Sequence, residues 1–367
     1  MRVPICLRVI TAVLAFFGAP VVLAQSAPAQ ESTTGRSFRW SDAYISARYI
    51  YVDNRGGRVR WSDVQYKVHL KGRWQFRAKE RTYLQFRAET GSSFQPGWNF
   101  SGWGRNAANR SFSVKDLFIG HRIGQRWELQ AGGIEFDRGA GTEITWADED
   151  GFQVGYRLSY RPERRHWPDR LQFTVSRIDE FQHPSVFARL PGMIEPNAME
   201  LLAQKQLWER VEVSTQFDRI SGVNFTRTAI RWKPQRLLDR ITLEAVVRAS
   251  NNPSAGYGLQ LARTWKRGGP WQMAFTYSHM EAGVFANSPR RLLLNGDQPA
   301  LGQRLAIHAS RPLGKRLTLA TFVSRQLDRT PSIPPHTRWR AQAVVTYRFT
   351  NWLNNFPRRG SSEKGGL

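Results

Sequence analysis

The feature that most constrains the fold is an alternation of side chains with a period of two. Apolar and polar residues alternate along 64–77, 152–161 and 339–349, and similar short segments fill most of the chain. Successive side chains of a β-strand point to opposite faces, so each such segment predicts a strand with one apolar and one polar face. No long segment has the period of a helix. The chain is therefore predicted to be all-β.

Sixteen segments carry this strand pattern, and most reach or exceed the roughly 9–11 residues that a tilted strand needs to cross a bilayer. The segments are 37–52, 58–77, 82–90, 112–122, 126–136, 151–161, 170–178, 198–208, 210–218, 222–233, 240–250, 255–266, 270–281, 303–311, 316–327 and 339–349. The same strand pattern repeats throughout, which predicts one structural unit over residues 37–349.

The connections between these segments differ in length with the parity of the strand that they follow. Connections after even-numbered strands are short, and several after odd-numbered strands are long: 91–111, 137–150, 179–197, 282–302 and 328–338. Transmembrane barrels have short turns on the periplasmic side and long loops outside. The sequence thus predicts a transmembrane antiparallel up-and-down β-barrel of about 16 strands, with 14 or 18 as alternatives.

The N-terminus indicates export. Arg2 and Arg8 precede or flank an apolar stretch that ends in small residues, which predicts a signal peptide at 1–24, with an uncleaved anchor as the alternative. The only cysteine, Cys6, lies in this segment, so the exported chain would have no disulfide. Export also argues against nucleic acid as a partner. A polar linker (25–36), the barrel (37–349) and a polar C-terminal tail (350–367) complete the predicted organisation.

The formal net charge is +25, and 45 of the 54 basic residues are arginine. Basic residues beside the short turns are expected to contact anionic lipid headgroups. A second group points inward by alternation. Since strand 16 pairs with strand 1 in a closed barrel, this group predicts a continuous pore-lining basic wall: Arg48, Lys67, Lys71, Arg73, Arg77, Arg87, Arg340 and Arg348. Further inward basic residues are scattered: Arg157, Arg227, Arg231, Arg248 and Arg304.

Tryptophan residues gather beside the short turns. They are Trp74, Trp127, Trp167, Trp208, Trp232, Trp265 and Trp271. Amphipathic aromatic rings favour the membrane–water interface, so these seven predict an interfacial girdle. The alternative is that they belong to a core, but core residues are expected in the middle of strands.

Three features resemble Gram-negative outer-membrane porins. One is the hairpin architecture over 37–349 behind a signal peptide. Another is the final strand, 341–349, which looks like the aromatic-ending signal read by the barrel-assembly machinery, although the tail follows Phe349. The third is segment 129–136 with the loop 137–141, which is similar to the alginate-export-like porins. The resemblance implies outer-membrane lipids, small solutes and the assembly machinery as partners, no cofactor, and either a monomer or a homotrimer.

In general porins the loop after the fifth strand folds into the lumen and faces a basic wall. The corresponding loop here is acidic, with Asp137, Glu143, Asp148, Glu149 and Asp150. We therefore expect a transverse field at a constriction, which would orient charged and dipolar solutes. The alternative is a solvated loop tip.

These observations predict a porin for passive diffusion that prefers anions, not an enzyme. A non-transporting barrel is the alternative: an adhesin, an assembly scaffold, or a glycan binder stacking sugar on Trp98 or Trp103. A lipid hydrolase is less well supported, because Ser278 and His279 are adjacent on a strand and would face opposite sides. The seven histidines show no metal-ligand spacing, so no metal is expected.

Overall fold

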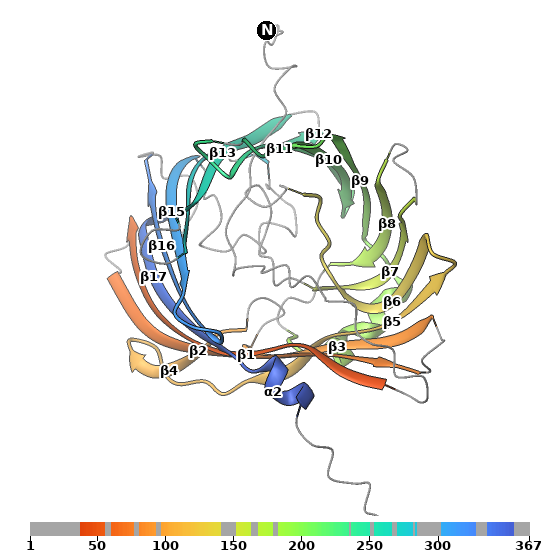
Figure 1. The fold of residues 1–367 in the computed structure, drawn as a ribbon, viewed down its shortest axis with the longest axis horizontal. Coiled ribbons are helices and arrows are strands. Elements are labelled where there is room, and N and C mark those ends of the chain that lie inside the picture. The colour runs from red at the N-terminus through yellow and green to blue at the C-terminus, as the bar shows by residue number, and fades with distance from the viewer. Residues whose placement is uncertain are drawn as a thin grey trace, which may run out of the picture.

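The computed structural model describes residues 37–55, 60–76, 81–92, 97–140, 152–162, 168–178, 183–234, 236–249, 253–265, 270–281, 283–284, 302–327 and 336–355. Within these residues the chain forms one antiparallel sheet that closes on itself into a barrel (Figure 1). The predicted signal peptide and linker, and the tail beyond residue 355, lie outside the described residues.

Sixteen strands make the closed ring, which confirms the predicted fold class and strand number. They are β1 (Ser37–Arg55), β2 (Arg60–Gln75), β3 (Thr82–Thr90), β5 (Phe112–Ile123), β6 (Trp127–Glu135), β7 (Phe152–Tyr160), β8 (Arg170–Arg177), β9 (Ala198–Trp208), β10 (Val211–Ile220), β11 (Val223–Trp232), β12 (Arg240–Ala249), β13 (Ser254–Trp265), β14 (Trp271–Met280), β15 (Gly302–Pro312), β16 (Leu317–Gln326) and β17 (His336–Arg348). Each pairs with its neighbours in the ring, and β17 pairs with β1.

A seventeenth strand, β4 (Asn99–Gly104), lies within the segment predicted as a single loop, 91–111. The C-terminal half of β2 pairs with β3 through His69–Gln75. The N-terminal half of β2 pairs with β4 through Asp63, Gln65 and Tyr66. β4 therefore extends the barrel wall beyond the end of β3. Its six residues include two glycines and do not alternate, which is why the sequence pattern did not predict it.

The faces of the strands are inverted relative to a water-soluble protein. On β10 the side chains of Ser214, Gln216 and Asp218 are buried, whereas Phe217 between them is 38% exposed. Ile45 and many other large apolar side chains on the ring are likewise exposed. Every strand of the ring has a neighbour on both sides, and an apolar outer face is what a bilayer requires.

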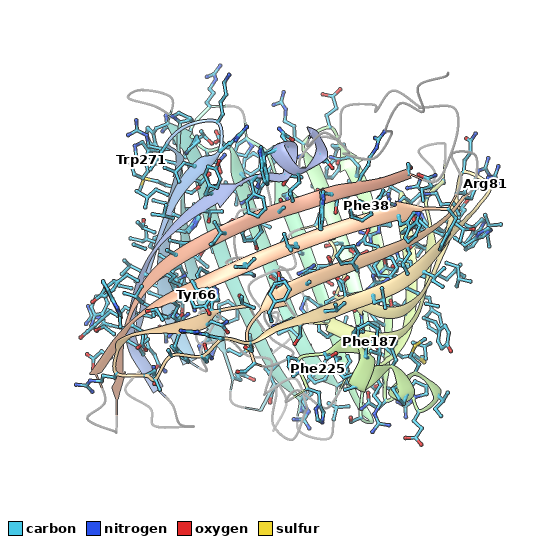
Figure 2. The ribbon with its side chains drawn as sticks, turned by 90° about the horizontal axis from the view of Figure 1, so that it is seen from below. Phe38, Tyr66, Arg81, Phe187, Phe225 and Trp271 are labelled. Carbon is cyan, nitrogen blue, oxygen red and sulfur yellow. The ribbon has the colours of Figure 1, made fainter. Side chains whose placement is uncertain are left out.

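The two ends of the barrel differ. Short connections, such as the turn at Glu209 and Arg210, join strands at one end, which we call the short-turn end. Figure 2 shows Arg81 and Trp271 at this end and Phe187 and Phe225 at the other. At the opposite, long-loop end, the β8–β9 connection contains α1 (Val186–Arg189) and the 3₁₀ helix η2 (Leu190–Ile194). Among the described residues, no helix is long and apolar enough to cross a membrane.

A short helix, α2 (Thr350–Asn355), follows β17 within the segment predicted as a polar tail. β1 begins pairing with β17 only at Tyr44, so its first residues extend beyond the end of that strand. The Trp40 N–H donates to Asn354 Oδ1 at 2.9 Å, and Asn354 Nδ2 donates to the Trp40 carbonyl at 2.9 Å. The Thr350 hydroxyl accepts from the Ala43 N–H at 2.8 Å. The helix thus supplies the partners that a neighbouring strand would otherwise give.

Candidate functional site: the barrel interior

The interior side chains come from strands whose outer faces are apolar. Arg48, Lys67, Arg87 and Arg340 are buried, and Lys71 and Arg73 are partly exposed. Arg348 lies near the short-turn end, where its Nε is 3.4 Å from Asp42 Oδ1. Arg77 lies outside the described residues. The β1–β17 pairing brings the strands that carry these basic residues together at the closure.

Carboxylates interrupt this basic group. Lys67 Nζ lies 3.5 Å from Glu89 Oε1, and Lys71 Nζ donates to Glu135 Oε1 at 2.6 Å. Arg87 contacts Glu89 at 3.8 Å, Asp116 at 3.3 Å, and Glu135. Burying charges is costly unless they are paired, and here they are paired. We call these six residues the charge cluster: Lys67, Lys71, Arg87, Glu89, Asp116 and Glu135.

Alternation places Glu89 on the inner face, two residues after Arg87 on β3, but it does not reveal the roles of Asp116 and Glu135. The segment that holds Asp116 alternates poorly, and a register shift occurs opposite it on β3 between Arg87 and Ala88. Strict alternation places Glu135 on the outer face, because Ile134 before it is buried with Tyr83 and Phe118. Glu135 is the last residue of β6, and its carboxylate contacts Lys71 and Arg87 on the inner face, so the alternation ends at this position.

Three other interior arginines are held by neutral side chains on neighbouring strands. Arg48 donates to Gln65 at 2.9 Å and to Gln342 at 3.2 Å. Arg73 donates to Gln85 from Nη2 at 2.8 Å and from Nε at 3.3 Å. An amide fixes the position of a guanidinium without cancelling its charge.

Arg157 is held in a similar way. It donates to Gln130 Oε1 at 3.3 Å, to Thr174 Oγ1 at 3.3 Å and to the Glu135 carbonyl at 2.6 Å. All three acceptors are uncharged. The bond to the Glu135 carbonyl also ties β7 to the end of β6, where the next connection begins.

The remaining inward basic residues have mixed surroundings. Arg227 Nε lies 3.3 Å from Glu244 Oε1, and its Nη1 lies 3.7 Å from Asp218 Oδ2. Arg231 contacts Glu212 at 3.5 Å, and Arg248 donates to the Gly283 carbonyl at 2.7 Å. Arg304 is buried on β15. This side of the interior therefore also mixes both signs of charge.

The described start of the connection after β6 enters the ring (Figure 1). Asp137 pairs with Arg170 on β8, and the Ala140 carbonyl accepts from Ser214 Oγ at 2.9 Å. A Cβ at Gly139 would overlap the Ser214 side chain, so the chain lies directly on the inner face of β10. The other four predicted constriction acids lie outside the described residues: Glu143, Asp148, Glu149 and Asp150.

Six of the seven predicted girdle tryptophans lie at the short-turn ends of their strands: Trp74, Trp127, Trp208, Trp232, Trp265 and Trp271. All except Trp271 are among the exposed large side chains. Trp167 lies outside the described residues. The interfacial role of these residues stays a prediction.

The two residues that suggested sugar stacking differ. Trp98 covers Arg48, with the guanidinium carbon 4.1 Å from the ring centroid, so one face of this ring is occupied. Trp103 on β4 is 77% exposed. The candidate hydrolase pair does not meet, because Ser278 is buried on the inner face and His279 lies beside Tyr257 at 5.4 Å between ring centroids.

A closed ring with an apolar exterior and a charged interior defines a transmembrane barrel of the pore type. No family model and no curated protein matches the sequence. Among solved structures, a Salmonella typhi OmpF complex with daunomycin has a TM-score of 0.57 at 11% identity, covering 86% of this chain and 98% of that one. A Rhodopseudomonas blastica porin variant has a TM-score of 0.55 at 8% identity, covering 86% and 100%. The chain has the fold of Gram-negative outer-membrane porins.

Proposed function

We propose that the protein is an outer-membrane porin that conducts small solutes by passive diffusion. The observation that carries this proposal is the closed sixteen-strand ring with charged side chains on its inner face and exposed apolar side chains on its outer face. An adhesin or a scaffold has no need of an interior rich in charges. No covalent chemistry is required, since the solute gradient drives transport.

We further propose that the pore prefers anions, and that the amide-held arginines are the source of this preference. Lys67, Lys71 and Arg87 contact carboxylates, so their charge is compensated. Arg73 and Arg157 donate to neutral acceptors. Uncompensated charge on the wall of a pore raises the local concentration of counter-ions. A transverse field between these arginines and the acidic connection 137–150 stays part of this proposal.

Planar-bilayer recording of the purified chain in a salt gradient tests both statements. We expect channel conductance, and a reversal potential of the sign that anion flow gives. A cation-selective reversal potential would refute the anion preference but not the proposal that the protein is a porin. Absence of conductance from correctly folded protein would refute the porin and favour the non-transporting barrel.

The cellular setting is also a proposal. The signal peptide at 1–24, the basic residues near the short turns and the tryptophans at the same end support export to an outer membrane, with the short-turn end in the periplasm. The assembly machinery would insert the barrel, and the protein would be a monomer or a homotrimer. Different gel mobility of heated and unheated samples is expected; equal mobility together with solubility without detergent would contradict it.

A further inference from the structure

Two arginines lie side by side on the inner face at the short-turn end. Arg39 on β1 and Arg73 on β2 are directly opposite each other in the antiparallel register. Their neighbours Trp40 and Gly72 face outward, where Trp40 packs against Phe86 with 5.9 Å between ring centroids. Residues opposite each other share a face, so both guanidinium groups belong to the lumen.

Arg73 is fixed in place by neutral groups. Gln85 accepts two of its hydrogen bonds, at 2.8 and 3.3 Å. Its guanidinium carbon also lies 4.1 Å from the centroid of the Tyr83 ring. That ring lies over Gly120, where a Cβ would overlap it, and its hydroxyl donates to Glu128. Arg73 is therefore oriented without losing its charge.

The nearby carboxylates have other partners. Asp42 lies 3.4 Å from Arg348, and Glu128 accepts from Gln130 at 2.8 Å as well as from Tyr83. Glu135, a member of the charge cluster, contacts Lys71 and Arg87. Across the described ranges, neither Arg39 nor Arg73 forms an ion pair, and Arg39 is exposed. Like charges directly opposite on adjacent strands repel, and a bound anion would relieve this repulsion.

We propose that Arg39 and Arg73 form a binding subsite for the oxyanion of a permeating solute, a carboxylate or a phosphate, at the short-turn mouth of the lumen. Guanidinium groups present forked donors that match the oxygens of carboxylates and phosphates. The subsite lies on the β1–β2 wall, apart from the segment 136–140 that crosses to β10. The proposal rests on the proposed pore, because a solute reaches this mouth from outside only through an open lumen.

The test compares the wild-type chain with Arg39→Gln, Arg73→Gln and the double variant. The matched control is Arg236→Gln, which removes the same charge from an exposed residue of the β11–β12 turn at the same end of the barrel. Binding of inorganic phosphate and of citrate is measured by calorimetry at low ionic strength, in a detergent without phosphate. We expect each single variant to weaken binding about tenfold, the double variant to abolish it, and the control to leave it unchanged.

Bilayer recording separates this subsite from the pore itself. Phosphate added on the short-turn side should reduce the wild-type current and leave the current of the double variant unaffected. Conductance without phosphate binding would overturn the subsite and leave the porin proposal intact, whereas binding without conductance would overturn the porin alone. Equal weakening in Arg236→Gln would overturn the subsite, since the effect would then be general surface charge. Binding only when phospholipid is present would also overturn it, because the anion would then be a lipid headgroup.

Discussion

Glu135 connects three parts of the barrel through one residue. Its carboxylate binds Lys71 on β2 and Arg87 on β3, and its carbonyl accepts from Arg157 on β7. It also precedes the segment that enters the lumen. A residue in this position sets the start of that segment as well as the local balance of charge.

Glu135→Gln should therefore make the lumen more positive and loosen the base of that segment. We expect a shift of the reversal potential toward greater anion selectivity, and a loss of about 1–3 kcal/mol in stability because Lys71 and Arg87 lose a charged partner. Bilayer recording and thermal unfolding measure the two effects. Glu195→Gln is the control, since Glu195 is 74% exposed in its ion pair with Arg177 and such pairs contribute little. Equal effects of both changes would contradict the role of Glu135.

Gly120 has a different importance, because its missing side chain makes room for the Tyr83 ring. Gly120→Ala should displace the ring and with it Arg73, which stacks on it. We expect a stability loss of about 1–3 kcal/mol from overpacking, together with weaker phosphate binding. The control is Gly314→Ala, where a Cβ meets nothing within 4 Å. Phosphate binding at the wild-type level in Gly120→Ala would show that the ring does not position Arg73.

At the scale of elements, α2 stabilises the closure of the ring. Asn354 uses one side-chain amide to donate to and accept from Trp40, as the peptide group of a strand would. Asn354→Leu should remove both bonds to Trp40, at a cost of about 1 kcal/mol because the bonds are exposed. The expected result is a lower temperature for loss of the compact form on unheated gels. Asn351→Leu alters an exposed residue of the same helix and should leave that temperature unchanged.

The elements also show what the sequence pattern can and cannot predict. All sixteen ring strands were predicted within a few residues, because alternation and loop length repeat along the chain. β4, α1, η2 and α2 were not predicted, because each has six residues or fewer and is too short to display a period. Each of them contacts strands of the ring: β4 pairs with β2, α1 lies against β5, η2 against β7 and α2 against β1.

At the scale of the whole molecule, alternation predicted which face a side chain occupies, as for Lys67 and Arg87. It did not predict which charges meet. Glu89, Asp116 and Glu135 come from three different strands, and their pairing with Lys67, Lys71 and Arg87 follows from the register and from the path of β6. The predicted continuous basic wall is therefore interrupted by carboxylates, and the excess of positive charge in the lumen is smaller than the count of inward arginines suggests.

The ion selectivity of the whole pore should depend on salt concentration. The Debye length falls from about 10 Å at 0.1 M to about 3 Å at 1 M, so wall charges act over a shorter range at high salt. We expect the proposed anion preference to decrease between these two mean concentrations at a constant gradient ratio. Reversal potentials measure this directly. An unchanged preference would point to selection by pore width instead of wall charge.

The contact between Asn354 and Trp40 joins residues that are 314 positions apart in the sequence. Bonds of this separation form only after nearly all of the polypeptide has been made. Until then β1 has one unpaired edge, and that edge is a template for adding foreign strands. Completion of the ring therefore depends on chain length, because a product that ends before β17 would keep two open edges, each able to pair with a foreign strand.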